Sequence, residues 1–278
     1  MNEHRLSANL RRIRPVIWWF LLAPLIVSNG ACTSLSVFQQ NVERFGFEPR
    51  TMAGDPFQHA VMMKPGKGQR LHVYIEGDGV PWIQERWIAQ DPTPWKLIMP
   101  TLMAMDSAPS LFIGRPCYFQ RYFQMPDPSC HDNQWWTSAR YSQAIINSLN
   151  RVLDLFTSDY DSIWLIGHSG GGTLAMLMAG KRDDIQGVVT LAGNLDTEAW
   201  SIAHHYSPLS GSLNPAQMPP LPAWVQQWHF LGTQDKRILP SMTESVVKKQ
   251  SGAHFELIDN LDHSCCWNRV WPDILEKW

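Results

Sequence analysis

The sequence predicts an α/β fold in which helices cover both faces of a mostly parallel sheet. Short apolar runs alternate with helical patterns along most of the chain, and several runs are continuously apolar, as buried parallel strands are. A length of 278 residues suits one domain with a single core. Hydrophobic residues make up 44% of the chain and charged residues 17%, so material for that core is present.

The apolar runs give the expected strands. They cover residues 58–64, 70–76, 110–114, 162–166, 187–192, 224–231 and 254–258. Helices are expected at 138–157, where apolar residues recur at steps of three and four, at 173–179, and at about 240–250. Segment 194–222, rich in Pro, Ser and His, interrupts this alternation. Its length is typical of a lid or binding segment, although a purely structural excursion is the alternative.

The first 32 residues predict an export signal. A stretch with several arginines precedes the apolar run 16–27, and small residues follow it up to Cys32. That run of about 12 residues is short against the roughly 20 of a membrane-spanning helix, with a short membrane anchor as the alternative. The end Gly-Ala-Cys resembles the lipobox of bacterial lipoproteins, which implies lipidation of Cys32 and a periplasm-facing lipoprotein of the bacterial cell envelope. Residues 33–56 are then an arm or linker ahead of the domain at 57–278.

Cysteine usage agrees with an exported protein. With Cys32 lipidated, four of the five cysteines remain, and an even number suits an oxidising compartment. Three pairings are open, of which Cys117 with Cys130 is the simplest because it closes a short loop. Cys265 and Cys266 could form a ring, stay reduced or pair elsewhere. A metal site is the competing interpretation, but the cysteines lack the spacing of metal ligands, so none is predicted.

Charge and aromatic content narrow the range of partners. A formal net charge of −2 gives no basic surface for phosphate, so a nucleic-acid-binding protein is not expected. The 14 tryptophans indicate amphipathic packing, an apolar pocket or contact with lipid.

Residues 167–171, Gly-His-Ser-Gly-Gly, contain the predicted nucleophile, Ser169. The expected strand 162–166 precedes this motif and the expected helix 173–179 follows it. A sharp strand-to-helix turn exposes the serine hydroxyl, and glycine on both sides allows the neighbouring chain to come close. The alternative is a glycine-rich helix start with an idle serine. A phosphate-binding loop is not expected, because no Gly-Lys-Ser/Thr follows.

A serine nucleophile needs a histidine base and a carboxylate that orients it. Asp235 lies in the loop just past the expected strand 224–231, and His263 lies in the loop just past the strand 254–258. Both therefore stand past the carboxyl ends of strands, in the chain order Ser, acid, His. A turn-capping Asp235, with Asp196 as the acid in its place, and a solvated loop His263 are the alternatives.

Two backbone N–H groups are predicted to stabilise the oxyanion. One belongs to Gly170, directly after the nucleophile. The other is expected in the loop Tyr-Ile-Glu-Gly-Asp-Gly at 74–79, from Asp78 or from Gly79. Because a negative charge beside an oxyanion is unfavourable, the carboxylate of Asp78 is expected to point away and to orient the loop.

Taken together, the 167–171 motif, Gly-Thr-Gln-Asp at 232–235 and Asp-His-Ser-Cys-Cys-Trp at 262–267 resemble the α/β-hydrolase superfamily over roughly residues 57–278. A closer resemblance, to a group of exported bacterial hydrolases, is carried by segments 74–79, 114–117, 136–137 and 208–215. The resemblance implies the α/β-hydrolase fold, a Ser-Asp-His triad, and neither a metal nor an organic cofactor. Glu76-Gly77 departs from the His-Gly of many members.

The resulting hypothesis is a serine esterase that cleaves a small-molecule or lipid-like ester through an acyl-enzyme. An acyltransferase or a peptidase could use the same residues. A catalytically silent lipoprotein that binds an envelope partner is the alternative outside enzymology. The presence of serine, acid and histidine in the expected order argues against it.

Overall fold

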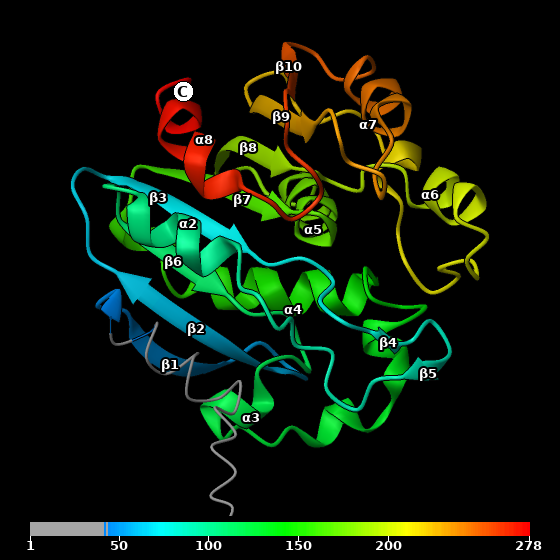
Figure 1. Cartoon of the computed structure of the whole chain (residues 1–278). Coiled ribbons are helices and arrows are strands. Elements are labelled where there is room, and N and C mark those ends of the chain that lie inside the picture. Colours follow the sequence, from blue (N-terminus) through cyan, green and yellow to red (C-terminus); the bar gives the residue numbers. More distant parts are fainter. Residues whose placement is uncertain (1–41, 43) are drawn as a thin grey trace, which may run out of the picture. The chain divides into compact units, whose positions relative to one another are not determined.

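Figure 1 shows the protein as a computed structural model, which describes Val42 and residues 44–278. The predicted export signal, including Cys32, and most of the predicted arm lie outside the described residues. Lipidation and export therefore stay predictions. No helix in the described part is both long enough and apolar enough to span a bilayer.

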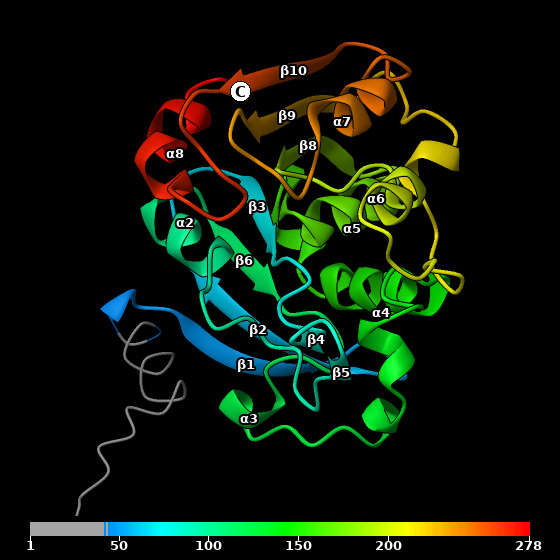
Figure 2. The same ribbon diagram turned by 45° about the vertical axis from the view of Figure 1, so that its right-hand side comes forward.

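An eight-stranded sheet forms the centre of this domain, with β1 and β10 at its opposite edges (Figure 2). Its strands, in order across the sheet, are β1 (Glu48–Ala53), β2 (Gln58–Lys64), β6 (Ser110–Ile113), β3 (Arg70–Ile75), β7 (Ser162–His168), β8 (Ile185–Leu191), β9 (Gln226–Gly232) and β10 (Ala253–Ile258). β2 is antiparallel to both of its neighbours, and all other pairs are parallel. The predicted, mostly parallel sheet is confirmed.

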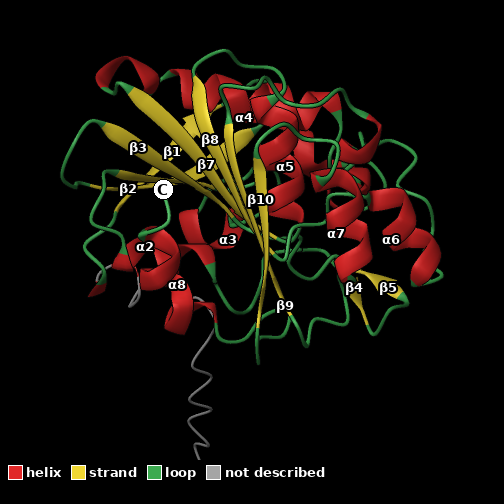
Figure 3. Ribbon diagram, turned by 90° about the horizontal axis from the view of Figure 1, so that it is seen from above, coloured by secondary structure: helices red, strands yellow, loops and turns green. Residues whose placement is uncertain are grey.

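Helices cover both faces of the sheet (Figure 3). They are α2 (Met99–Met105), α3 (Gln120–Phe123), α4 (Gln143–Asp154), α5 (Gly170–Ala179), α6 (Thr197–Ala203), α7 (Pro240–Val247) and α8 (Trp267–Leu275), with short 3-10 turns at Pro128–His131, Asn133–Trp136, Thr157–Asp159 and Pro215–Gln217. α2 and α8 contact each other on one face, and α4 and α5 contact each other on the opposite face. A separate hairpin of β4 (Trp82–Ile83) and β5 (Trp87–Ile88) follows β3.

The sequences of α4 and α5 suit their positions in this arrangement. All ten residues of α5 are buried, and its sequence is accordingly apolar on every side. α4 is amphipathic and buries Ile145, Leu149 and Val152 on one face. The side chain of Ser142 accepts the N–H of Ile145, so α4 begins at residue 143 and not near the expected 138.

Three parts of the fold differ from the expected elements. β1 lies within the range expected for the arm, and most of its residues are exposed, so it carries no apolar run. The excursion 194–222 contains the short helix α6. Neither α2 nor α8 is expected from the sequence. In α8 the buried residues Trp267, Trp271 and Ile274 have helical spacing, but Pro272 lies among them and a proline argues against a helix interior.

Two disulfides occur in the described part of the chain. Cys117 and Cys130 are joined by an S–S bond of 2.05 Å. This pairing is the simplest of the three that the sequence allows. Cys265 is joined to its neighbour Cys266, in the connection between β10 and α8. The second pair thus begins two residues after His263 in the chain.

His59 in β2 is a fully buried imidazole that holds β2 to its surroundings. Its Nδ1–H donates to the carbonyl oxygen of Gly114 at 2.8 Å, and its Nε2 accepts from the hydroxyl of Ser148 at 2.7 Å. With the hydrogen on Nδ1 and none on Nε2 the ring is neutral, which is the form that burial favours. Burial lowers the pKa of His59 from 6.5 to about 4.

This lowered pKa predicts acid sensitivity. The folded chain resists protonation of His59 between pH 6.5 and 4, whereas the unfolded chain does not, so the stabilisation is complete above pH 6.5 and is lost as the pH falls toward 4. Between pH 6.5 and 4.5 the loss is about 2 to 3 kcal/mol of unfolding free energy. Denaturant unfolding of the wild type and of His59→Gln at both pH values measures it. The variant should lose less stability on acidification, and equal losses would contradict the assignment.

Candidate active site

Ser169 occupies the turn from β7 into α5, with φ 52° and ψ −121°. A positive φ is strained for a residue with a side chain, so the surrounding chain must hold the turn in place. A Cβ on Gly167 would lie 2.2 Å from the carbonyl oxygen of Gly171, and a Cβ on Gly171 would lie 2.1 Å from that of Ile75. Only glycine fits these two positions, because α5 lies so close to β3 and β7.

The structure brings together the three residues expected to act on the substrate. The hydroxyl of Ser169 and Nε2 of His263 are 3.0 Å apart, and Nδ1 of His263 lies 2.8 Å from Oδ2 of Asp235. A carboxylate can only accept, so Nδ1 carries the hydrogen and Nε2 is free to accept from Ser169. The three residues follow β7, β9 and β10, whose carboxyl ends share one edge of the sheet.

Asp235 is fixed by more than its histidine. Its Oδ1 accepts the N–H groups of Arg237 at 2.8 Å and Ile238 at 2.9 Å. Burial alone would raise the pKa of Asp235, but the hydrogen bond from His263 and the two backbone N–H groups hold it below its ordinary value. The carboxyl group is therefore ionised at neutral pH.

Asp196, the alternative acid, has a different role in the structure. Its Oδ1 accepts the N–H of Ala199 and the side-chain amide of Asn214, each at 3.1 Å. These bonds make Asp196 the N-cap of α6.

His168, to which the sequence analysis gave no role, holds the backbone of His263. Its Nε2–H donates to the carbonyl oxygen of His263 at 2.7 Å, and the indole N–H of Trp267 donates to the same oxygen at 3.2 Å. Burial, together with the neighbouring imidazole of His263, lowers the pKa of His168 to about 3, so its ring is neutral. The signal that could have revealed it is its place directly before Ser169.

Both predicted oxyanion donors lie close to Ser169. Gly170 is the first residue of α5, and a Cβ on Gly77, which directly precedes Asp78, would lie 3.3 Å from Cβ of Ser169. Among the described residues, the N–H groups of Gly170 and Asp78 donate to no protein atom. They are therefore available to a ligand.

The carboxylate of Asp78 is held by two buried guanidinium groups. Arg115 donates to Oδ1, while Arg140 at 3.2 Å and the hydroxyl of Tyr141 at 2.5 Å donate to Oδ2. The hydroxyl of Tyr118 also donates to the backbone carbonyl of Asp78, at 2.9 Å. Burial opposes ionisation, but the two arginines hold the pKa of Asp78 far below its ordinary value. The side chain thus orients its loop, through partners that no sequence pattern indicated. It does not point away from the predicted donor Gly170 as expected, since a Cβ on Gly170 would lie 2.1 Å from Oδ1 of Asp78.

Glu76, which stands where many α/β-hydrolases have histidine, has a structural role. Its carboxylate accepts the N–H groups of Gly77 at 3.1 Å, Ile98 at 2.9 Å and Met99 at 3.0 Å. Two of these donors are the unpaired N–H groups at the start of α2. Burial raises the pKa of Glu76 to about 7. Glu76 therefore fixes both ends of the connection between β3 and α2.

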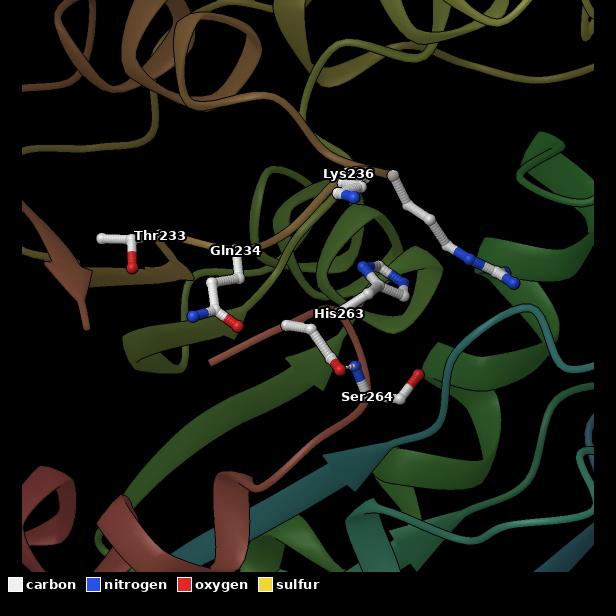
Figure 4. Close-up of a pocket in the computed structure, with 7 residues that line it drawn as sticks. Thr233, Gln234, Lys236, His263 and Ser264 are labelled. Atoms are coloured by element: carbon white, nitrogen blue, oxygen red, sulfur yellow. Dashed lines mark hydrogen bonds between the residues drawn. The ribbon is translucent and has the colours of Figure 1, made fainter. Parts of the chain in front are cut away.

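A pocket opens beside His263 (Figure 4). The residues that line it are Thr233, Gln234, Lys236, Arg237, Asp262, His263 and Ser264. They come from the connections after β9 and β10. Within the described residues, no three His, Cys, Asp or Glu side chains are close enough to hold a metal ion together.

In the described part of the chain, Asp78 is the one anion that is paired with both Arg115 and Arg140, so its replacement by a neutral side chain should greatly lower the stability of the fold. Asp78→Asn leaves Arg115 and Arg140 buried without a counter-charge, which should lower the unfolding free energy by about 3 to 5 kcal/mol. Denaturant unfolding at pH 7 measures this loss. Asp273→Asn, which alters an exposed aspartate in α8, is the control and should change stability by less than about 0.5 kcal/mol. Equal stability of the two variants would contradict the prediction.

Comparison with known proteins relates the fold to solved structures. No family model matches the sequence, and neither does any curated protein. Est1E from Butyrivibrio proteoclasticus, solved with ferulic acid bound, has a TM-score of 0.57 at 14% identity, over 82% of this chain and 96% of that chain. An esterase from Pyrococcus furiosus has a TM-score of 0.56 at 11% identity, over 84% of this chain and 89% of that chain.

A third solved structure belongs to an α/β serine hydrolase homologue from Coxiella burnetii. It has a TM-score of 0.53 at 14% identity, over 82% of this chain and 94% of that chain. Identities this low bear on architecture alone. The described chain has the α/β-hydrolase fold.

Proposed function

We propose that this protein is a serine hydrolase that cleaves carboxylic esters through an acyl-enzyme on Ser169. The observation that carries the proposal is the continuous hydrogen-bonded series from Asp235 through His263 to the hydroxyl of Ser169. A strained turn presents that hydroxyl. One of the similar structures is an esterase by name and another is a puromycin-hydrolysing peptidase, so the choice of an ester over an amide is part of the proposal.

The proposed reaction begins with attack of the Ser169 hydroxyl on the ester carbonyl, while Nε2 of His263 takes the hydroxyl proton. The carbonyl oxygen becomes an oxyanion and accepts the N–H groups of Gly170 and Asp78. His263 then gives its proton to the departing alcohol, which leaves the acyl group on Ser169. Water attacks this second ester with the same proton transfers, releasing the acid and restoring the serine.

The environment of His263 suits this cycle. Ionised Asp235 stabilises the imidazolium that forms after proton transfer and fixes the ring tautomer. The neighbouring ring of His168 stays neutral, so no fixed positive charge opposes that imidazolium. The two guanidinium groups bound to Asp78 offset its negative charge close to the proposed oxyanion site.

Labelling with a fluorophosphonate probe tests the nucleophile. The wild type should form one covalent adduct, Ser169→Ala should form none, and His263→Ala should react at least about a thousandfold more slowly because the base is lost. Ser264→Ala, in the same pocket, is the matched control and should label at the wild-type rate. Labelling of Ser169→Ala equal to that of the wild type would disprove the assignment. An unreactive wild type would favour the silent binding protein.

The contact between His168 and His263 predicts a selective loss of turnover. His168→Phe keeps a ring of similar size but removes the N–H that holds the His263 carbonyl, so the base should lose its alignment with Ser169. A displacement of this kind should lower kcat by about a hundredfold, while KM changes little. Steady-state kinetics on a short-chain ester measure both constants, with His205→Phe at an exposed site as control. A wild-type kcat in His168→Phe would show that the contact is dispensable.

A further inference from the structure

The mouth of the proposed site has two chemically different sides. One side, after β9, carries the neighbouring cations Lys236 and Arg237. On the other side, the connection between β3 and α2, residues 76–98, passes Ser169 at Gly77 and then exposes a series of large apolar side chains. In the view of Figure 4, Lys236 and Ser264 lie on opposite sides of the His263 ring.

The cationic side belongs to the same pocket as His263. Lys236 and Arg237 are both exposed, and within the described residues neither side chain is in an ion pair. The nearby carboxylate of Asp262 is already used by its own loop, since Oδ1 accepts the N–H groups of Ser264 and Cys265 at 2.7 Å each. These bonds do not cancel the charge of Asp262, so Lys236 and Arg237 exceed it by one positive charge among the residues that line the pocket.

The apolar side is unusual in its exposure. Five large apolar side chains that solvent reaches lie within one short stretch, namely Trp82, Ile83, Trp87, Ile88 and Trp95. Trp87 is 61% exposed and Trp95 is 81% exposed. When several large apolar side chains of one short stretch are this exposed, they indicate a surface that an apolar ligand covers.

The connection that carries this apolar stretch starts beside Ser169 and reaches the loop of His263 near its other end. Gly77 lies against Ser169, and the N–H of Val80 donates to the carbonyl oxygen of Pro92 at 2.8 Å, which brings residues 92–95 back toward Gly77. Next to Trp95, Nζ of Lys96 lies 3.4 Å from the carbonyl oxygen of Ser264. The residue that follows Trp95 therefore reaches the loop that carries His263.

We infer that the substrate is an amphiphilic ester, with a long apolar acyl group against the 82–95 stretch and an anionic alcohol portion facing Lys236 and Arg237. The inference rests on the proposed function. The proposed mechanism assigns the two sides, because His263 must give its proton to the departing alcohol, which therefore lies on the side of the His263 pocket. The acyl group then extends from Ser169 toward the connection that starts at Gly77.

Four chromogenic esters test both halves of the inference with the full chain. They are 4-acyloxy-3-nitrobenzoates with butanoyl or dodecanoyl chains, whose alcohol portion is anionic, and their methyl esters, whose alcohol portion is neutral. The kcat/KM of the wild type should be about tenfold higher for each anionic ester than for its neutral partner, and added salt should reduce that ratio. Dodecanoyl esters should exceed butanoyl esters by about tenfold, since the longer chain covers more apolar surface.

Matched variants assign each preference to its side. Lys236→Gln combined with Arg237→Gln should bring the anionic-to-neutral ratio close to one, whereas Lys249→Gln, at an exposed site in the connection after α7, should retain it. Trp95→Ser, and Trp82→Ser combined with Trp87→Ser, should each lower the dodecanoyl-to-butanoyl ratio by about threefold or more. Trp224→Ser, at a residue that is 54% exposed ahead of β9, should leave that ratio unchanged.

The outcomes separate this inference from the function on which it rests. If Ser169 is labelled by the fluorophosphonate but the wild type hydrolyses all four esters equally well, the inference is overturned and the hydrolase proposal stands. The inference also fails if both ratios exist but the paired variants and their controls change them alike. If the wild type is neither labelled nor active, both fail together.

Discussion

The paired charges around Asp78 hold together the region on which the candidate site is built. One carboxylate joins its own connection after β3 to Arg115, which follows β6, and to Arg140 and Tyr141, which precede α4. Charges buried in this way are tolerated only when their remaining hydrogen-bonding groups are also satisfied. Arg115 donates to the carbonyl oxygen of Arg140, and Nε of Arg140 donates to that of Thr137. Nε of Arg115 is the exception, because it is buried without a hydrogen-bond partner among the described residues. Three loops distant in sequence therefore depend on one anion.

Glu76 supplies the complementary constraint from within the same connection. It satisfies two N–H groups at the start of α2 and one at Gly77, so the chain between them has fixed ends. At the position where many α/β-hydrolases have histidine, Glu76 thus orients this loop through its carboxylate. The exposed hairpin of β4 and β5 is carried by a connection that is rigid at its base.

The sequence predicted those features that depend on neighbours along the chain. The central strands follow from their apolar runs, and Ser169, Asp235 and His263 could be found because each lies within a few residues of the end of such a run. The partners of Asp78 lie 37, 62 and 63 residues away, and no local pattern encodes a pairing at that distance. β1 was hidden for a different reason, since an exposed edge strand has no need of apolar residues.

The two bonds that His263 receives from the Ser169 turn have a mechanical consequence. Ser169 is hydrogen-bonded to the imidazole of His263, and the adjacent His168 donates to the main-chain carbonyl of His263. Two neighbouring residues therefore hold both the side chain and the backbone of His263. The turn and the loop that carries His263 form a small closed ring of covalent and hydrogen bonds. When the turn at Ser169 moves, the imidazole of His263 moves with it. Motion of either loop therefore changes the distance between the Ser169 hydroxyl and the imidazole less than it would if the two loops were independent.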